Sequence, residues 1–247
     1  MTLMSTTLLR RLGVAAALAL VVGGAACSPT PSQPPYEVTS TTVSDSSTRD
    51  ITAWRPVVDG PWPTVVAIHG FGGARGDLDE LAGALAAQGM VVFAPDYETA
   101  SIEQDIVCAI GYARAHTSDQ GGDPTGAFAV VGHSLGGAIA LLTLNPPPGA
   151  ACESPVVGDG PDMVFSVAGC PWVEEPGEPP FDPAGYGSPD VPIVLVAAED
   201  DEVCPAEQTD RAARALQHLP RRDSAITRWR RGAVGRPPPR GRAASRR

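Results

Sequence analysis

The sequence predicts an α/β fold in which helices flank a mostly parallel central sheet, without a large cap domain. Its 247 residues, 43% of them hydrophobic, suffice for one large domain with a substantial core. Short apolar runs alternate along the chain with longer segments of helical periodicity. This alternation favours parallel strands joined by helices, and ligands of such sheets bind at the carboxyl ends of the strands.

Strands are expected where an apolar run is short and a turn follows. Residues 64–68 (TVVAI) are such a run and precede His69-Gly70, which is typical of a strand buried on both faces. The further runs of this kind are 90–94, 127–131, 163–167 and 191–197. Residues 223–230 can still form a last strand.

Helices are expected where apolar residues recur every three or four positions. In residues 77–88 these positions hold Leu78, Leu81 and Leu85, and Gly89 ends the segment. The same spacing predicts a helix over 102–116 and another over 206–219. A further helix is expected over 135–144.

The residues Gly132-His133-Ser134-Leu135-Gly136 form a G-x-S-x-G pattern between a predicted strand and a predicted helix. In this context the serine lies on a sharp, strained turn that exposes its hydroxyl above the sheet. Only small residues fit at the two flanking positions, because side chains there would crowd the turn. The helix that follows directs backbone N–H groups toward developing negative charge. The pattern predicts Ser134 as a nucleophile; a turn without chemistry is the alternative.

With these features the chain resembles the α/β-hydrolases, in particular serine esterases of the dienelactone-hydrolase-like and polyester-hydrolase-like kind. The resemblance covers residues 51–219. It depends on His69-Gly70-Phe71-Gly72-Gly73 after one strand, on the turn at Ser134, and on residues 198–205 (AEDDEVCP) after a later strand. It implies an α/β-hydrolase fold and cleavage of carboxylic esters through an acyl-enzyme, without a cofactor.

The resemblance also implies which backbone groups form the oxyanion hole. In the family, the residue after the His-Gly pair donates one N–H and the residue after the nucleophile donates the other. These positions are Phe71 and Leu135 in this chain. Each donor lowers the barrier by about 3 kcal/mol. His69 is expected to brace the loop by hydrogen bonds rather than to transfer a proton.

The acid of the triad is expected after the predicted strand 191–197. The family pattern Gly-x-x-Asp-x-x-x-Pro is matched with alanine in the place of glycine, Asp201 as the acid and Pro205 at the end. Asp200 and Glu199 are alternatives for the acid. A solvated acidic loop without a catalytic role is a further alternative.

The sequence does not reveal the general base that a serine nucleophile needs. In the family, a histidine follows the acid and one more strand. Only His218 follows Asp201, and the predicted helix from Ala206 places it about 18 Å from the site. His116 ends another helix in the same way. The ring of His133, inside the turn, is expected to point away from the hydroxyl.

The C-terminal residues 220–247 account for this gap. Where the family reads Gly-Ala-x-His, this chain reads Gly-Ala-Val-Gly, so Gly235 stands in the expected place of the histidine. Arginine, proline, glycine and alanine dominate the remainder, as in a GC-rich gene read out of frame. We interpret 220–247 as an aberrant, disordered basic tail whose native reading frame is lost after about Leu219. A genuine tail that contacts anionic lipids is the alternative.

The N-terminus has the composition of an export signal. Arg10 and Arg11 precede an apolar run at 12–22 and small residues up to position 26, as in a secretory signal peptide. Cys27 resembles the lipid-bearing cysteine of a bacterial lipobox; plain secretion is the alternative, and the arginine pair also allows a twin-arginine signal. Residues 27–48, rich in Pro, Ser and Thr, are expected to form a disordered tether before a hydrolase domain at 49–219.

Four further cysteines predict two disulfides in an exported protein, with three possible connectivities. They are Cys108, Cys152, Cys170 and Cys204. Cys170 and Cys204 both follow strands expected to be neighbours at one edge of the sheet. Our hypothesis therefore pairs these two and leaves Cys108 to pair with Cys152.

Charge and motifs exclude several classes of function. The net charge is −10, although 12 of the 18 basic residues lie in 211–247, so the body of the chain is strongly acidic and unsuited to nucleic acid. No HExxH motif, zinc-type Cys/His spacing or Walker loop is present.

Two hypotheses about function follow. One is an exported, monomeric bacterial esterase with an open cleft for short-chain, lipid or polyester-like esters. The other is an inactive or truncated surface lipoprotein that at most binds.

Overall fold

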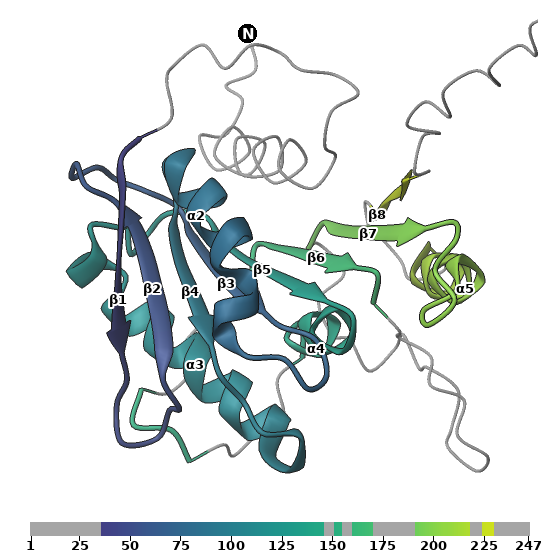
Figure 1. Cartoon of the computed structure of the whole chain (residues 1–247), viewed down its shortest axis with the longest axis horizontal. Coiled ribbons are helices and arrows are strands. Elements are labelled where there is room, and N and C mark those ends of the chain that lie inside the picture. Colours follow the sequence, from purple (N-terminus) through teal and green to yellow (C-terminus); the bar gives the residue numbers. More distant parts are fainter. Residues whose placement is uncertain (1–35, 146–150, 155–159, 170–190, 218–223, 230–247) are drawn as a thin grey trace, which may run out of the picture.

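The computed structural model describes residues 36–145, 151–154, 160–169, 191–217 and 224–229. They form an eight-stranded sheet in the order β1-β2-β4-β3-β5-β6-β7-β8 (Figure 1). The strands are β1 (Val38–Val43), β2 (Ile51–Pro56), β3 (Thr64–Ile68), β4 (Val91–Pro95), β5 (Phe128–His133), β6 (Met163–Val167), β7 (Ile193–Ala198) and β8 (Ser224–Trp229). β2 is antiparallel to β1 and β4, and all other neighbours are parallel. The predicted mostly parallel sheet is confirmed.

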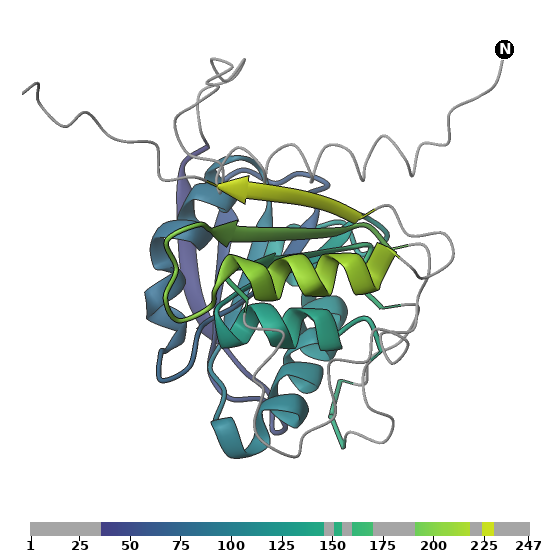
Figure 2. The same cartoon turned by 90° about the vertical axis from the view of Figure 1, so that its right-hand side faces the viewer.

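Helices cover both faces of this sheet. They are α2 (Asp79–Ala87), α3 (Ile102–His116), α4 (Leu135–Leu142) and α5 (Ala206–Gln217), with short 3-10 turns η1 (Arg75–Leu78), η2 (Thr99–Ser101) and η3 (Ser118–Gln120). Buried residues of α3, α4 and α5 share one core cluster, and those of α2 belong to the other. In Figure 2, α5 lies along β7 with α4 beside it. Within the described residues no helix is long and apolar enough to cross a membrane.

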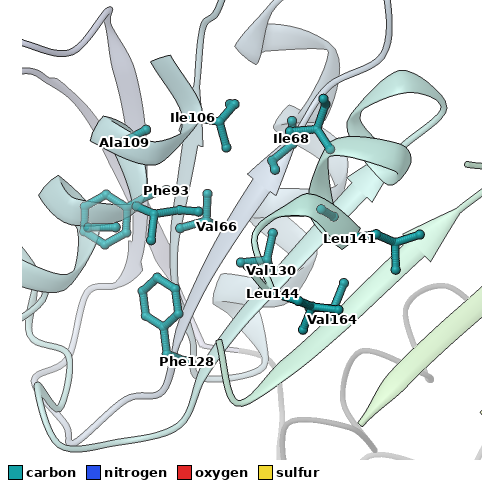
Figure 3. Packing of buried hydrophobic residues seen from close by; sticks show 14 of the residues in the cluster. Val66, Ile68, Phe93, Ile106, Ala109, Phe128, Val130, Leu141, Leu144 and Val164 are labelled. Atoms are coloured by element: carbon teal, nitrogen blue, oxygen red, sulfur yellow. The ribbon is translucent and has the colours of Figure 1, made fainter. Parts of the chain in front are cut away.

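β3 lies at the centre of this three-layer arrangement. Val66 and Ile68 belong to the cluster shared with α3, α4 and α5, whereas Val65 and Ala67 belong to the cluster under α2. Figure 3 shows Val66 and Ile68 packed with Phe93, Val130 and their neighbours. Because alternate side chains of a strand face opposite ways, a strand covered on both sides must be apolar throughout. This requirement explains why β3 was recognisable in the sequence as an uninterrupted apolar run.

The predicted elements are found where apolar periodicity is strong. Strands 64–68 and 163–167 and helix 102–116 are confirmed at both ends, and the other predicted elements differ from the observed bounds by at most two residues. β2 was not predicted, although Ile51 and Ala53 alternate with more exposed residues. Because β2 is a short antiparallel strand near one side of the sheet, only one of its faces carries a continuous apolar signal.

The prediction that residues 27–48 form a disordered tether is wrong for 38–43, which form β1. All six of its residues are paired with β2, from Val38 opposite Pro56 to Val43 opposite Ile51. The middle four side chains of β1 are exposed. Main-chain pairing rather than side-chain burial thus stabilises this edge strand, so composition alone does not predict it. The predicted signal peptide 1–26 and Cys27 lie outside the described residues.

The prediction that residues 220–247 form a disordered tail is wrong for 224–229, which form β8. This strand is parallel to β7 with Ser224 opposite Ile193 and Trp229 opposite Ala198. The sheet therefore continues past α5, as the alternative interpretation of 223–230 allowed. The rest of the predicted tail lies outside the described residues, and so does the segment 170–190 that a cap would have to occupy.

The predicted disulfide between Cys108 and Cys152 is confirmed, with an S–S distance of 2.07 Å. It joins α3 to the segment 151–154, where the backbone N–H of Glu153 donates to Ser47 Oγ of the β1–β2 connection. Cys204 is also disulfide-bonded. Because Cys170 lies outside the described residues, its pairing with Cys204 stays a prediction.

Candidate active site

Ser134 lies on a strained turn between β5 and α4. Its backbone has φ 54° and ψ −123°, and Ala168 is the other non-glycine residue with positive φ in the described part of the chain. The turn is held on both sides: Ser134 N–H donates to Val167 O at 3.0 Å, and Gly137 N–H donates to Ser134 O at 2.8 Å. A positive φ costs a residue with a side chain about 1–3 kcal/mol, and such strain concentrates at functional sites.

The glycines of the G-x-S-x-G pattern are sites of close backbone approach. A Cβ atom on Gly132 would overlap the carbonyl oxygen of Gly136. A Cβ atom on Gly136 would in turn overlap the carbonyl oxygens of Ile68 and His69 at the end of β3. The first turn of α4 is therefore pressed against the residues that lead into the His-Gly loop.

The loop after β3 is a tight turn that faces this serine. Gly73 N–H donates to Gly70 O at 3.2 Å and Gly72 has φ 70°, which together define a type II turn with Phe71 at its second position. A Cβ atom built on Gly70 would lie 3.2 Å from Ser134 Cβ. The His-Gly loop and the G-x-S-x-G turn, which are about 60 residues apart in the sequence, are thus in contact.

Both predicted oxyanion donors have N–H groups without a hydrogen-bond partner among the described residues. The N–H of Leu135 belongs to the first residue of α4, where no preceding helical carbonyl is available. The N–H of Phe71 makes no internal bond in its turn. The Phe71 side chain is 73% exposed, an unusual state for a phenylalanine.

A cavity of about 460 Å³ lies between these elements. Its polar wall includes Ser134, His69 and His133. Its apolar wall is formed by side chains from β3, η1, α2, β5 and β6, which are Ile68, Leu78, Leu81, Val131 and Val167. A polar rim around an apolar pocket is the usual design of a small-molecule site, and here the serine lies on that rim.

Tyr97, which belongs to none of the sequence motifs, holds the His-Gly loop in place. Its single hydroxyl hydrogen is shared between His69 O at 2.9 Å and Gly70 O at 3.1 Å, and its ring stacks on the His69 ring at 4.0 Å. Burial raises the pKa of Tyr97 to about 12, so the hydroxyl keeps its proton at neutral pH. Tyr97 lies two residues after the end of β4, and β4 is the neighbour of β3. A polar aromatic residue at the end of a strand beside β3 is the sequence signal that could have indicated this role.

His69 has the bracing position that was expected of it. Its Nδ1 lies 2.8 Å from Gly70 O and must carry the hydrogen, because a carbonyl oxygen only accepts. Its Nε2 is buried without a hydrogen-bond partner in the described part of the chain. No hydrogen bond joins His69 to Ser134 Oγ among the described residues.

Asp201 lies in a turn beyond the carboxyl end of β7, at the same edge of the sheet as Ser134. One carboxylate oxygen accepts hydrogen bonds from Val203 N–H at 2.9 Å and Cys204 N–H at 2.8 Å. The other oxygen makes no hydrogen bond within the described residues. β6 separates β5 from β7, so the two strand ends are about 10 Å apart. An imidazole between them is the group that such an anchored carboxylate can orient.

The alternatives to Asp201, which are Asp200 and Glu199, are both exposed. His116, at the end of α3, forms a hydrogen bond with Asp119 at 2.8 Å and stacks on Tyr112. His133 is exposed at the cavity. The positions of His218 and Gly235 lie outside the described residues. The described residues include no group of three His, Cys, Asp or Glu side chains that could hold a metal ion.

Comparison with known proteins agrees with this geometry. A family model described as the alpha/beta hydrolase family matches residues 65–243. The chain belongs to this family. The match begins in β3, so it includes the His-Gly loop, the turn at Ser134 and the Asp201 loop.

Individual relatives of this alpha/beta hydrolase are more distant. A bis(hydroxyethyl) terephthalate hydrolase of Streptomyces coelicolor is 26% identical over 181 residues, which are 69% of this chain and 52% of the relative. The chain thus spans about half the length of that protein. Two solved esterase structures share the fold. A truncated carbohydrate esterase from gut microbiota has a TM-score of 0.65 at 15% identity, covering 81% of this chain and 90% of that one. An esterase of Thermogutta terrifontis with bound propionate has a TM-score of 0.61 at 19% identity, covering 83% of this chain and 86% of that one.

Removing the Phe71 N–H is expected to slow ester hydrolysis about 100- to 1,000-fold, the usual cost of losing one oxyanion donor. Proline at position 71 has no N–H, yet it suits the second position of a type II turn, so Phe71→Pro should keep the loop conformation. Phe71→Ala is the matched control, because it removes the same ring and keeps the N–H. Steady-state kinetics on a p-nitrophenyl ester measures both. Equal rates for the two variants would contradict the assignment of this donor.

Proposed function

We propose that this protein is an exported serine hydrolase that cleaves carboxylic esters through an acyl-enzyme. The observation that carries the proposal is the position of Ser134. It lies on a turn of positive φ at the rim of a partly apolar cavity. It faces the loop whose Phe71 N–H has no acceptor in the part of the chain that the structure describes. A hydroxyl with two unpaired amides nearby is the arrangement that acyl transfer needs.

In the proposed reaction, Ser134 Oγ attacks the acyl carbon and the carbonyl oxygen becomes an oxyanion. The N–H groups of Phe71 and Leu135 stabilise this charge. Breaking the bond to the alcohol oxygen leaves an acyl group on Ser134, which water then removes as the acid. Asp201 orients the imidazole that takes the serine proton and passes it to the alcohol oxygen as the ester bond breaks. The family position of that imidazole corresponds to Gly235 in this chain.

The shape of the site supports small or surface-bound esters as substrates. One wall of the cavity is apolar, and the cavity volume of about 460 Å³ suits a short acyl group. The side chains of that wall are Ile68, Leu78, Leu81, Val131 and Val167. Phe71 and Val203 are 73% and 79% exposed on loops at the carboxyl edge of the sheet, where they offer apolar contacts to a larger ester. The name of the Streptomyces relative, a terephthalate-ester hydrolase, agrees with such a substrate.

Export is supported by two features of the chain. The first 27 residues have the order of a signal peptide ending in a lipobox-like cysteine. The disulfide between Cys108 and Cys152 suits an oxidising compartment. We therefore infer a cell-envelope lipoprotein anchored at Cys27, with plain secretion as the alternative.

A second candidate function is a hydrolase-fold surface protein without turnover. The observation in its favour is that no histidine of the described residues forms a hydrogen bond with Ser134 Oγ. Because β8 pairs with β7 in this frame, we infer that the native reading frame is lost only after about Trp229, and reading the two other frames of the gene downstream tests this. Finding no histidine and following helix in either frame would contradict that inference.

Purified protein is expected to release p-nitrophenol from p-nitrophenyl acetate and butyrate with an initial burst, because an acyl-enzyme forms faster than it hydrolyses. Stopped-flow absorbance measures the burst amplitude against the enzyme concentration. Butyrate should be hydrolysed faster than palmitate, since a short acyl group can be buried whole in the cavity of about 460 Å³. Release no faster than that in buffer would contradict the esterase and favour the binding protein.

A further inference from the structure

Three hydrogen-bond donors converge on one carbonyl oxygen next to the candidate oxyanion hole. Gly70 O accepts from His69 Nδ1 at 2.8 Å, from Tyr97 Oη at 3.1 Å and from Gly73 N at 3.2 Å. A carbonyl oxygen has two lone pairs, so three donors saturate this acceptor, and the hydrogen of Tyr97 Oη is shared between it and His69 O. No other carbonyl of the His-Gly loop is held in this way in the described part of the chain.

The oxygen of Gly70 and the N–H of Phe71 belong to the same peptide group. A trans peptide is planar, and its C=O and N–H bonds point in opposite directions. No cis peptide occurs among the described residues. Fixing the carbonyl of Gly70 toward Tyr97 and His69 therefore fixes the N–H of Phe71 away from them. That N–H has no acceptor among the described residues, and Phe71, Gly70 and Ser134 line the same cavity.

The same donors also polarise the peptide. Hydrogen bonds to a carbonyl oxygen strengthen the bond that the opposite N–H can donate, as in any hydrogen-bonded chain of amides. Tyr97 is suited to this task because its ring is clamped against His69, with an interplanar angle of 7°. Its hydroxyl is also shared with His69 O at 2.9 Å, so it spans the two peptides that precede Phe71.

We propose that Tyr97 is a positioning residue for ester hydrolysis: its hydroxyl orients and polarises the Gly70–Phe71 peptide so that the Phe71 N–H meets the oxyanion. This inference rests on the proposed function. It adds a residue outside the predicted catalytic set, acting through the backbone. A residue that only stabilised the loop would not favour the transition state over the bound substrate.

Tyr97→Phe is the direct test, because it removes the hydroxyl and keeps the ring that stacks on His69. We expect kcat for p-nitrophenyl butyrate to fall about tenfold, less than the loss of a whole donor, with KM within about twofold. Affinity for a boronic acid, which forms a tetrahedral adduct on serine, should fall by a similar factor. Tyr112→Phe is the matched control: it removes another buried tyrosine hydroxyl, on α3, and should leave kcat unchanged.

A double-mutant cycle identifies the route of the effect. If Tyr97 acts through the Phe71 N–H, Tyr97→Phe should lower kcat less than twofold in the Phe71→Pro background, where that N–H is absent. A full tenfold loss in both backgrounds would overturn the proposal, because Tyr97 would then act elsewhere. Unchanged kcat in Tyr97→Phe alone would overturn it as well.

A measurement without turnover separates this inference from the proposed function. In the isotope-labelled protein, the carbonyl ¹³C shift of Gly70 and the amide ¹⁵N shift of Phe71 report the polarisation of their shared peptide. We expect both to move in Tyr97→Phe and to stay in place in Tyr112→Phe. Unmoved signals would overturn the inference even in an active enzyme. A different outcome is an unmodified protein that hydrolyses no ester, with signals that nevertheless move in Tyr97→Phe. This result would contradict the proposed function and would support the orientation of the Gly70–Phe71 peptide by Tyr97.

Discussion

Replacing Ser134 with alanine is expected to reduce ester hydrolysis at least about 10,000-fold, because the nucleophile and its acyl-enzyme are both lost. The fold should persist, since the backbone bonds of the turn do not involve the hydroxyl. Alanine keeps the Cβ atom, so the strain at φ 54° is unchanged. Initial rates on p-nitrophenyl butyrate, with circular dichroism as a check on folding, measure the effect.

Ser118→Ala is the control for this substitution. Ser118 is an exposed serine in η3, outside the cavity, and its loss should leave the rate unchanged. Hydrolysis that persists in Ser134→Ala would show that another group performs the reaction. Equal losses in the two variants would point to a general effect on the protein.

Replacing Gly132 with alanine is expected to lower the free energy of unfolding by at least about 3 kcal/mol and to abolish activity. The added Cβ would overlap the carbonyl oxygen of Gly136 in the first turn of α4, and neither backbone can move freely. α4 is held between the end of β3 and the end of β5, so a shift there displaces Ser134 too. Urea unfolding followed by tryptophan fluorescence measures the loss.

Gly76→Ala is the matched control, because a Cβ atom there would have no neighbour within 4 Å. Its effect should be within about 0.5 kcal/mol, since it lies at an open surface position. A Gly132→Ala protein as stable as Gly76→Ala would mean that the turn relaxes easily. In that case the strained geometry of Ser134 would not be imposed by its neighbours.

The parts of the fold that the sequence predicted are those with a repeating apolar signal. β3 and α3 were predicted to the residue, because each carries an apolar pattern of the right period and a clear stop. β1 was missed because Thr39 to Thr42 are exposed and paired only through the backbone. No side-chain pattern reports such pairing, so an edge strand rich in Thr and Ser resembles a tether.

The site divides in the same way. The turn at Ser134 and the loop at Phe71 are contiguous motifs whose glycines have a steric reason, and short segments of sequence carry that information. Tyr97 and its bonds to the His-Gly loop join residues 27 and 28 positions apart. They become visible only when β4 lies beside β3. The pairing of Cys108 with Cys152 was reached because the expected strand order left few choices.

The central claim is that Ser134 is the nucleophile of this alpha/beta hydrolase, and covalent labelling tests it most directly. Purified protein is treated with a fluorophosphonate, digested and mapped by tandem mass spectrometry. The geometry predicts a single phosphonate adduct, on Ser134, that forms more slowly in Phe71→Pro because the phosphoryl oxygen also uses that N–H. An adduct on a different residue, or no adduct in a protein that hydrolyses esters, would contradict the claim.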